Sequence, residues 1–423
     1  MNNYTNFLKK YANQKNKSEI VIFGAGTIGR LTFGALKSKN INPSYFCDSD
    51  IRKQKSKIEG IEVISPETLY NFDKANTDIF ISANYFKSIL PSVRKQGFEN
   101  IYVATELLED SDIQNLYKKM DRKFFVGELF PLKLERTVAF YNEMGRKEDY
   151  INSGKLNIKT IDVQITEKCS LKCKDCSNLM QYYTKPIDSE LSTLLESVDK
   201  FMRCVDSLDE FRILGGDPFM SKDLHKIINK LVTYDQCKKV VVYTNARIVP
   251  KGNNLEALKN DKVMLDITNY GESSSAHLKV IELAKKENIA FSTMRCTTWQ
   301  DCGRIIPFSN KNVNDLEHQF TNCCNSDLIT LLHGKLYRCP FSANGVNLNA
   351  IPQKSTDEVN LLNKELTVDE TREQIKKLCY EKKYLEACYY CNGRDYSSVD
   401  INSAIQTKKP MEYTKVVNST FKK

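Results

Sequence analysis

Three cysteines within eight residues, Cys169, Cys173 and Cys176, have the types and spacing that carry the clearest chemistry in the sequence. Thiolates bind metals, and three of them in one short loop can surround a small metal cluster. They cannot complete a tetrahedral zinc site without a fourth ligand, and no further Cys or His lies nearby in the sequence. A [4Fe–4S] cluster held by three cysteines keeps one iron open for another molecule. The alternative is a structural zinc site completed from a distant part of the chain.

A short polar turn ends the next expected strand. It consists of Gly215, Gly216, Asp217 and Pro218. Glycine lets the backbone approach a ligand closely, and the Asp217 carboxylate can attract a positively charged group. Taken alone, Gly-Gly-Asp-Pro is equally an ordinary turn. Polar residues also end the two strands that follow, at Thr244 with Asn245 and at Thr268, where strand-end turn chemistry is an equally good explanation.

On these motifs the chain resembles the radical S-adenosylmethionine (radical SAM) superfamily. Its signature is Cys-x3-Cys-x2-Cys in the loop after the first strand of a partial (β/α)6 barrel, and the three cysteines and the strand before them match it. The turn at residues 215–218 resembles the Gly-Gly-Glu-Pro motif that binds the amino group of SAM, with Asp217 in place of glutamate. A second departure is Asp175, because the family often has an aromatic or apolar residue directly before the last cysteine.

The resemblance implies a [4Fe–4S] cluster on the three cysteines, with SAM bound at the open iron. It also implies that Thr244 and Asn245 lie near the ribose of SAM, and Thr268 near its ribose or carboxylate. Reductive cleavage of SAM in this family gives methionine and a 5′-deoxyadenosyl radical, which removes a hydrogen atom from a substrate. A flavodoxin- or ferredoxin-type protein is the expected electron donor. No general base stands out among the scattered histidines, which are His225, His277, His318 and His333.

A second group of cysteines follows residue 310. It consists of Cys323, Cys324, Cys339, Cys388 and Cys391. A glycine five residues before Cys339, followed by a distant Cys-x2-Cys, resembles the SPASM/twitch extension of radical SAM enzymes. The resemblance implies an auxiliary [4Fe–4S] cluster held by Cys339, Cys388, Cys391 and either Cys323 or Cys324, of which we favour Cys323. A structural zinc ion is the alternative, since four thiolates suit either metal.

The other cysteines carry weaker signals. Four are expected to be small buried side chains: Cys47, Cys204, Cys237 and Cys379. Cys296 and Cys302 are expected near the top of the barrel, where either packing or a function facing the substrate is open.

Two stretches of alternating strands and helices must position these motifs. The first has five expected strands, at residues 19–23, 44–47, 61–64, 78–83 and 100–104. This alternation is typical of a doubly wound α/β sheet. The second has five expected strands, at residues 158–165, 210–214, 239–243, 263–267 and 289–294. With helices between them, these strands are typical of a barrel or partial barrel of parallel strands. A hairpin is expected around His333 and Gly334.

A glycine-rich turn lies between the first strand and the first helix of the N-terminal stretch. It contains Gly24, Gly26 and Gly29, and Asp48 ends the second strand. This is the context of a dinucleotide-binding fingerprint, in which the helix N-terminus favours a phosphate and the acid binds a ribose hydroxyl. The alternative is a domain that keeps the fold without the ligand. Residues 20–69 also resemble the N-terminal domain of nucleotide-sugar acyltransferases and related surface-glycan enzymes, which bind nucleotide sugars or serve as docking units.

The patterns divide the 423 residues into four parts. These are a Rossmann-like nucleotide-binding domain (1–109), a helical connector (110–155), a radical SAM partial barrel (156–310) and a twitch/SPASM-like auxiliary domain (311–423). Hydrophobic residues make up 41% and charged residues 27%, as in soluble globular proteins. Because no apolar stretch has the length of a membrane span and no signal peptide is visible, we expect a cytoplasmic protein. The net charge of +9 suits anionic small molecules, and no dense Lys/Arg block indicates nucleic acid.

These features predict a radical SAM enzyme, of oxidoreductase or isomerase type, acting on a sugar or nucleotide sugar in surface-glycan biosynthesis. The sugar is inferred from the company of the N-terminal domain. One alternative is a radical SAM peptide maturase, because many twitch and SPASM members act on peptides. Another is an iron–sulfur protein that only carries electrons or senses redox state. The open-iron loop and the Gly-Gly-Asp-Pro turn argue against it, because an electron carrier needs no SAM site.

Overall fold

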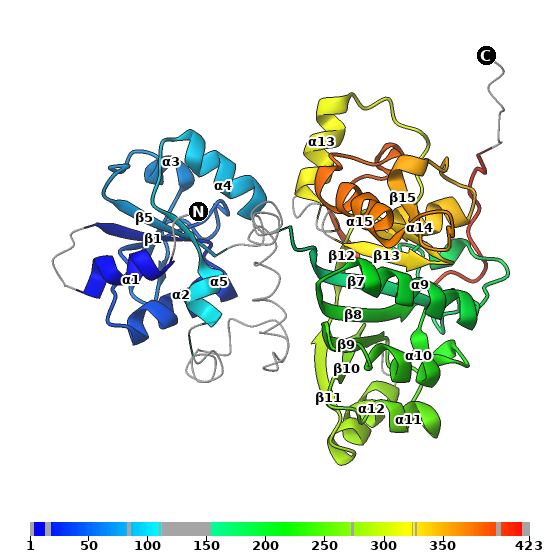
Figure 1. Cartoon of the computed structure of the whole chain (residues 1–423). Helices are drawn as coiled ribbons and strands as arrows, with labels where there is room; N and C mark the ends of the chain where they lie inside the picture. Colours follow the sequence, from blue (N-terminus) through cyan, green and yellow to red (C-terminus); the bar gives the residue numbers. More distant parts are fainter. Residues whose placement is uncertain are drawn as a thin grey trace. The chain divides into compact units, whose positions relative to one another are not determined.

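The computed structural model describes residues 4–12, 18–82, 86–109, 111, 154–271, 275–323, 325, 328–394 and 399–416. The chain forms two compact units, residues 1–145 and residues 146–423, which are described separately (Figure 1). The expected connector at 110–155 lies outside the described residues, apart from positions 111, 154 and 155.

The first unit is built on a six-stranded sheet with the order β3-β4-β2-β1-β5-β6. All neighbouring strands are parallel except the short β3–β4 pair. The five strands expected from the sequence are present, and β3 is added. Its elements are α1 (Tyr4–Ala12), β1 (Glu19–Phe23), α2 (Thr27–Ser38), β2 (Tyr45–Cys47), β3 (Lys57–Ile58), β4 (Ile61–Ile64), α3 (Pro66–Leu69), β5 (Thr77–Ile81), α4 (Phe86–Lys95), β6 (Ile101–Val103) and α5 (Ala104–Glu109). The strand order reverses between β1 and β5, which is where open α/β sheets bind ligands.

The second unit is built on an eight-stranded sheet with the order β11-β10-β9-β8-β7-β13-β14-β15. Its first part contains β7 (Asn157–Thr166), η2 (Met180–Tyr182), α9 (Leu191–Cys204), β8 (Ser207–Gly215), η3 (Pro218–Met220), α10 (Leu224–Leu231), β9 (Cys237–Thr244), α11 (Asn253–Ala257), β10 (Val263–Asn269), α12 (Ala276–Lys286), β11 (Ala290–Arg295) and β12 (Thr298–Gln300). The five expected strands are β7 to β11, and neighbouring members of this set pair in parallel. The carboxyl ends of parallel strands lie at one edge of a sheet, so the motifs that follow β7, β8, β9 and β10 are brought together there.

The C-terminal third joins this same sheet. Its elements are α13 (Val313–Asn322), β13 (Ile329–Leu332), β14 (Lys335–Tyr337), α14 (Pro340–Asn347), η4 (Ser355–Asp357), β15 (Glu358–Asn360), α15 (Val368–Lys376), the π-helical η5 (Lys377–Glu381), η6 (Glu386–Tyr390) and β16 (Asp400–Asn402). β13 pairs in parallel with β7, and β14 and β15 continue the sheet antiparallel. The segment expected to begin a separate domain at residue 311 therefore extends the central sheet. The expected hairpin is present: β13 and β14 pair antiparallel and are joined by His333 and Gly334. Both residues have positive φ, which is typical of a two-residue hairpin turn.

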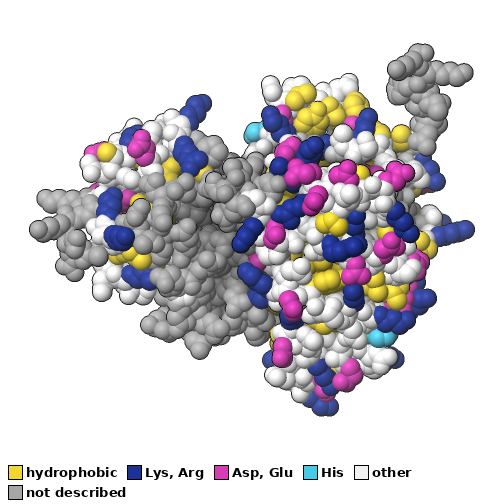
Figure 2. All heavy atoms as spheres, viewed as in Figure 1, with side chains coloured by type: hydrophobic (Ala, Val, Ile, Leu, Met, Phe, Trp, Pro, Cys, Tyr) yellow, Lys and Arg dark blue, Asp and Glu magenta, His cyan; other side chains and the backbone are white. Residues whose placement is uncertain are grey.

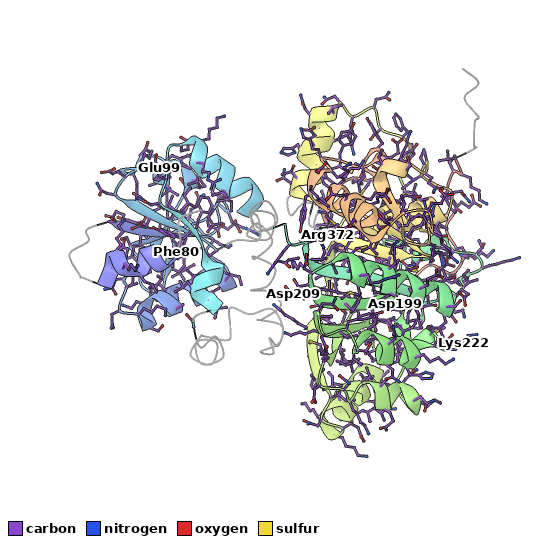
Figure 3. All side chains as sticks on the ribbon, in the orientation of Figure 1. Phe80, Glu99, Asp199, Asp209, Lys222 and Arg372 are labelled. Atoms are coloured by element: carbon purple, nitrogen blue, oxygen red, sulfur yellow. The ribbon has the colours of Figure 1, made fainter. Side chains whose placement is uncertain are left out.

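Long-range contacts tie the ends of this unit to its sheet. Arg372 of α15 donates to the carbonyl oxygens of Gly154 and Cys204, which precede β7 and β8, and pairs with Asp206 (Figure 3). β16, near the C-terminus, pairs antiparallel with β12. Basic and acidic side chains are interspersed over the face shown in Figure 2. Among the helices of the described ranges, none is both long and apolar enough to cross a membrane.

Candidate active site

The three-cysteine loop begins three residues after β7, and its thiols lie in one another's electrostatic field. Burial raises the pKa of Cys173 to about 12, and the nearby Cys176 adds to the rise. Burial also raises the pKa of Cys169, to which Asp217 and the other two thiols contribute. Three thiols that disfavour one another's ionisation form a site where a bound cation is stabilising, because metal ligands must be thiolates. The donor set therefore fits an iron–sulfur cluster with three protein ligands.

Hydrogen-bond donors surround these sulfurs. The backbone N–H of Leu171 lies 3.4 Å from Cys169 Sγ, and Asn245 Nδ2 lies 3.7 Å from the same sulfur. Gln406 Nε2 donates to Cys173 Sγ at 3.1 Å. Donors around cluster sulfurs stabilise thiolate charge and adjust reduction potential. Within the described residues, no three Cys, His, Asp or Glu side chains converge closely enough to hold a single metal ion.

The Gly-Gly-Asp-Pro turn packs directly against the three-cysteine loop. Gly216 N donates to Thr166 O at 2.9 Å, and Asp217 N donates to Lys168 O at 2.8 Å. A Cβ on Gly216 would lie 2.1 Å from Lys168 O, and one on Gly215 would lie 2.1 Å from Thr166 O. Only glycine allows this approach of two backbones. The two motifs that the sequence separates are therefore neighbours in the structure.

The Asp217 carboxylate accepts hydrogen bonds from other residues of the chain. Its carboxylate accepts hydrogen bonds from Phe219 N at 3.0 Å, Thr244 Oγ1 at 2.9 Å and Asn245 N at 3.1 Å, and the residue is only 1% exposed. Burial raises the pKa of Asp217, while these three donors act in the opposite direction. In this arrangement Asp217 ties the glycine turn to the end of β9. Pro218 starts η3, whose N-cap is Asp217.

Thr244, Asn245 and Thr268, which the sequence places near the ribose, differ in how many hydrogen bonds they already form within the chain. Thr244 is buried, donates to Asp217 and accepts from Ala246 N. The Asn245 side chain contacts Ser170 Oγ at 3.1 Å, beside the cluster loop. Thr268 lies half-buried on β10, paired with Met294 of β11. Of the three, Asn245 and Thr268 keep exposed surface for a ligand.

An aromatic pair beside the cluster thiols was not anticipated from the sequence. Tyr270 and Trp299 pack edge to face, with ring centroids 5.5 Å apart, against a buried cluster of Leu171, Cys173 and Ala404. Burial raises the pKa of Tyr270, and the cluster cysteines and Cys296 add to the rise. Tyr270 follows β10 directly, so its position at a strand end was the available signal.

Asp175 departs from the superfamily pattern, and the structure gives the reason. Its buried carboxylate forms an ion pair with Arg304, and a Cβ on Gly303 would lie 1.9 Å from Asp175 O. The loop that follows β12 is thus fastened to the three-cysteine loop by a charge pair and a close backbone contact. An apolar side chain at position 175 would leave Arg304 without this partner.

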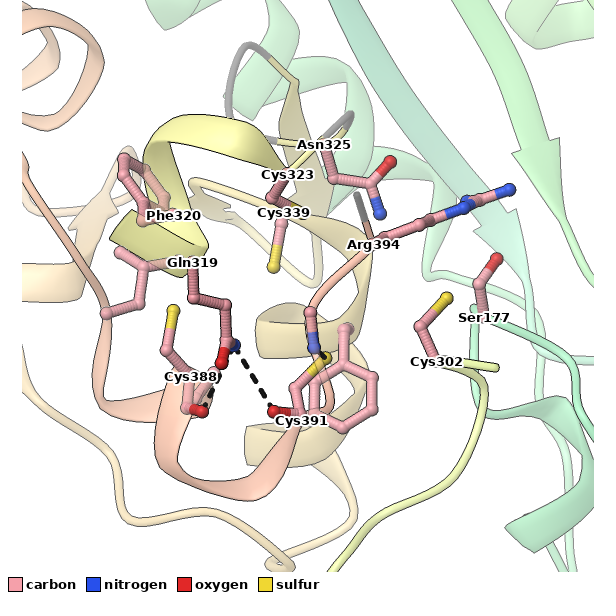
Figure 4. Close-up of a pocket in the computed structure, with 14 residues that line it drawn as sticks. Ser177, Cys302, Gln319, Phe320, Cys323, Asn325, Cys339, Cys388, Cys391 and Arg394 are labelled. Atoms are coloured by element: carbon pink, nitrogen blue, oxygen red, sulfur yellow. Dashed lines mark hydrogen bonds between the residues drawn. The ribbon is translucent and has the colours of Figure 1, made fainter. Parts of the chain in front are cut away.

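The C-terminal cysteines line one pocket (Figure 4). The four are Cys323, Cys339, Cys388 and Cys391. Cys323 caps the end of α13, while Cys339 is the N-cap of α14 and accepts from Ser342 N at 3.2 Å. Burial raises the pKa of Cys339, and Cys388 and Cys323 add to the rise. Because these thiols also act on one another, the donor set fits a fully ligated iron–sulfur cluster, whereas the described side chains do not converge closely enough for a single zinc ion. Cys324 lies outside the described residues.

Two side chains hold the Cys-x2-Cys segment in place, and sequence analysis missed both. Gln319 Nε2 donates to Cys388 O at 3.3 Å and Cys391 O at 3.2 Å (Figure 4). Lys311 Nζ donates to Gln319 Oε1 at 2.6 Å and to Cys391 O at 2.7 Å. Because Gln319 lies on the helix that ends at Cys323, one helix positions three of the four thiols.

Two residues outside the C-terminal cysteine set also line this pocket, Cys302 and Ser177, and Ser177 directly follows Cys176. Burial raises the pKa of Cys391, and Cys323 and the buried Cys302 add to the rise. The other expected core cysteines are all buried: Cys47, Cys204, Cys237 and Cys379.

The glycine turn of the first unit has the close packing expected of a fingerprint. A Cβ on Gly29 would lie 1.8 Å from Gly24 O, and Gly26 caps α2. The Asp48 carboxylate accepts from Ala25 N at 2.8 Å and pairs with Lys53 Nζ at 2.9 Å. Asp48 is therefore joined to the glycine turn, at the end of β2 where the sequence analysis placed it.

A layer of buried polar side chains crosses the central sheet. Cross-strand pairing sets Thr330, Asp162 and Arg212 side by side on one face, with Thr160 one step away beside Glu210. Among the described residues, four buried atoms of this layer lack a hydrogen-bond partner: Thr160 Oγ1, Asp162 Oδ1, Arg212 Nε and Thr330 Oγ1. Buried polar atoms are normally hydrogen-bonded, and here Asp162 Oδ1 and Arg212 Nε lie 3.3 Å apart as an ion pair.

Comparisons with known proteins find relatives of parts of the chain. No protein-family model matches the chain. Curated proteins named GTP 3′,8-cyclase, from Aquifex aeolicus and Aliarcobacter butzleri, are 23% and 29% identical over 150 and 132 residues. The matches cover 31% and 30% of this chain, and 47% and 36% of the relatives, so the chain spans less than half of their length. Together with the cysteine loop and the glycine turn, this similarity supports a radical SAM superfamily member.

Solved structures overlap parts of the chain. BtrN in complex with AdoMet and 2-DOIA overlaps 61% of this chain and 99% of its own, at 14% identity and a TM-score of 0.38. Native anSMEcpe with bound AdoMet and a Cp18Cys peptide overlaps 33% and 44%, at 16% identity and a TM-score of 0.28. UDP-D-quinovosamine 4-dehydrogenase from Vibrio fischeri overlaps 23% and 88%, at 25% identity and a TM-score of 0.19. At such TM-scores these overlaps carry no argument about substrate.

Proposed function

We propose that this chain is a radical SAM enzyme that acts on a sugar or a nucleotide sugar. The observation that carries the reaction class is the packing of the Gly215–Pro218 turn onto the three-cysteine loop. The two backbones approach so closely that a Cβ added to Gly216 would lie 2.1 Å from Lys168 O. A [4Fe–4S] cluster with SAM supplies reductive cleavage to methionine and a 5′-deoxyadenosyl radical that removes a substrate hydrogen. A flavodoxin- or ferredoxin-type protein is the proposed electron donor.

The chain's own residues have distinct roles in this proposal. Cys169, Cys173 and Cys176 are the cluster ligands, and the glycine turn presents backbone oxygens to the SAM amino group. Asp217 fixes that turn through its bonds to β9. Asn245 and Thr268 face the nucleoside, and Tyr270 excludes water on the cluster's other side.

A second cluster completes the proposal. Cys323, Cys339, Cys388 and Cys391 are proposed as its ligands, in a twitch-like arrangement that begins after residue 310. Ser177, which directly follows Cys176 in the sequence, lines the same pocket as these four cysteines. Full ligation by four thiols leaves no open position, so the site is not proposed to bind SAM.

The substrate class is supported by the polar layer on the central sheet. Thr160 and Thr330 are buried, and their hydroxyl oxygens have no hydrogen-bond partner among the described residues, beside the Asp162–Arg212 ion pair. A sugar carries hydroxyls that both donate and accept, so it can satisfy both threonines. Separately, the glycine turn of the first unit, with Gly24, Gly26, Gly29 and Asp48, is proposed as a nucleotide-binding site of that unit. The relatives named GTP 3′,8-cyclase make nucleoside triphosphates the next class to test.

The test measures 5′-deoxyadenosine release by the anaerobically reconstituted full chain with SAM and a reductant. The panel contains nucleotide sugars, GTP and cysteine-containing peptides. Cys173→Ala should abolish release, since two thiols cannot hold the cluster. Cys237→Ala is the matched control, because this buried thiol lies on β9 outside both cysteine sites.

Each outcome bears on a different part of the proposal. Stimulation by one nucleotide sugar supports the substrate class, whereas stimulation by a peptide alone supports the maturase alternative. Full release by Cys173→Ala, or none by wild-type protein with both clusters present, contradicts the reaction class. Zinc in place of iron at the C-terminal site contradicts the second cluster alone.

A further inference from the structure

The C-terminal segment of residues 399–416, here called the C-terminal strap, crosses the three-cysteine loop. Lys174 N donates to Ile405 O at 2.8 Å, and Thr407 N donates to Lys172 O at 2.7 Å. These two bonds lie on either side of Gln406 and of Cys173, which form an isolated antiparallel bridge. The strap therefore follows the cluster loop in register, through backbone pairing that does not depend on side-chain type.

Gln406 is the strap residue that reaches a sulfur. Its Oε1 accepts from Lys172 N at 2.6 Å, which fixes which end of the amide is oxygen. Its Nε2 donates to Ala404 O at 2.6 Å and to Cys173 Sγ at 3.1 Å. Both amide hydrogens and the carbonyl oxygen are thus engaged, so the N–H is held toward the thiol.

Contacts on both sides of Gln406 anchor the strap. Before it, β16 pairs with β12, and Ser403 Oγ donates to Cys296 O at 2.7 Å. After it, Met411 N donates to Gln181 O at 2.8 Å, and Tyr413 OH donates to Leu348 O at 2.9 Å. The amide position is therefore set by the surrounding structure and not by the Cys173 contact alone.

We propose that Gln406 is a positioning residue for the open-iron cluster, and that its N–H···S bond to Cys173 raises the cluster's reduction potential. This inference rests on the proposed function. One-electron reduction adds negative charge that the ligand sulfurs share, so a fixed donor stabilises the reduced form more than the oxidised form. A higher potential favours transfer of an electron from the donor protein to the cluster, and it lowers the driving force for transfer from the cluster to SAM.

The test compares the midpoint potential of the open-iron cluster in full-length wild-type and Gln406→Leu protein, by anaerobic redox titration followed by EPR. The change of the EPR signal on adding SAM identifies this cluster. Gln406→Leu should make reduction about tenfold less favourable, a shift of about 59 mV to more negative potential. Gln406→Glu should shift it further in the same direction, because a carboxylate oxygen would then face the thiolate. Ser403→Ala is the matched control, since it removes a strap contact that touches no sulfur, and its potential should equal that of wild type.

The outcomes separate this inference from the proposed function. Equal potentials for wild type and Gln406→Leu, with the SAM-responsive signal present in both, overturn the inference and leave the reaction class standing. An equal shift in Ser403→Ala also overturns it, because strap attachment would then be the cause. If Gln406→Leu retains too little iron to titrate, Gln406→Met, which keeps the side-chain length without a donor, takes its place. A wild-type protein without a SAM-responsive cluster overturns the proposed function itself.

Discussion

Arg212 Nε lies 3.3 Å from Asp162 Oδ1, across the paired strands β8 and β7. Asp162 is only 2% exposed, and burial raises its pKa to about 6, a rise that Arg212 opposes and Glu210 increases. Burial therefore disfavours the charged form of Asp162 more than the positive charge of Arg212 favours it. Such a pair is suited to binding polar groups rather than to stabilising the sheet.

This pKa sets a pH dependence for stability. Between an unfolded-state pKa of about 4 and the folded-state pKa of about 6, the folded protein holds a proton that the unfolded chain has released. Stability should fall as pH rises through that window, by about 3 kcal/mol at most, and the Asp162 contribution should be constant above it. Asp162→Asn, which cannot ionise, should remove this part of the slope. Urea unfolding of both proteins at about pH 5 and about pH 7 checks it, and an unchanged slope in the variant contradicts it.

Gly216→Ala should damage the radical SAM site. The added Cβ would lie 2.1 Å from Lys168 O and 2.7 Å from Cys169 N, and neither backbone atom can move without displacing the three-cysteine loop. We expect at least about a tenfold loss of 5′-deoxyadenosine release, equivalent to about 1.4 kcal/mol. Gly252→Ala is the control, because its Cβ meets open space and only its φ of +56° is unfavourable. That control should lose about 1 kcal/mol of stability without losing activity. A similar loss of activity in both variants would show a general folding effect.

Arg304→Ala should loosen the three-cysteine loop by leaving the Asp175 carboxylate buried without its partner. The Asp175 side chain is 2% exposed, but that of Arg304 is 44% exposed, so solvent weakens the pair. We expect a loss of about 1–3 kcal/mol and faster removal of iron by a chelator. Asp175→Asn/Arg304→Ala should recover part of the loss, since no charge then remains buried. If the double variant is no better than Arg304→Ala, the ion pair is not what holds the loop.

The sequence was sufficient for the parts of the site that depend on local spacing. Cys169, Cys173 and Cys176 were predicted as one cluster because three thiols in one loop must lie together. Five strands in each unit followed from their apolar runs, and the Cys323, Cys339, Cys388 and Cys391 set is brought together as predicted. These features depend on neighbours in the chain or on a family pattern.

Contacts made by segments that are distant in sequence were not predictable. Gln406 lies more than 200 residues from Cys173, in a polar tail with no periodicity that indicates a partner. The parallel pairing of β13 with β7 likewise joins the C-terminal third to the central sheet, and no local sequence pattern indicates that pairing. The sequence indicates a carboxylate at Asp217 that can attract a positive group. That this carboxylate accepts hydrogen bonds from Thr244 and Asn245 is seen only in the folded chain.

Gln319→Leu should weaken the C-terminal cysteine site alone. Gln319 donates to both Cys388 O and Cys391 O, and Lys311 holds its amide oxygen at 2.6 Å, so the change removes two of the bonds that fix the Cys-x2-Cys turn and the partner that positions Lys311. We expect loss of the auxiliary cluster's iron, while the SAM-responsive signal of the first site remains. Lys383→Met is the control. This exposed lysine forms an ion pair of 3.6 Å with Glu317, which lies on α13, the helix that carries Gln319. Iron content and EPR of both variants, reconstituted in parallel, make the comparison. Equal iron in Gln319→Leu and wild type would contradict the proposed positioning, and loss of both signals would show that α13 supports the two sites together.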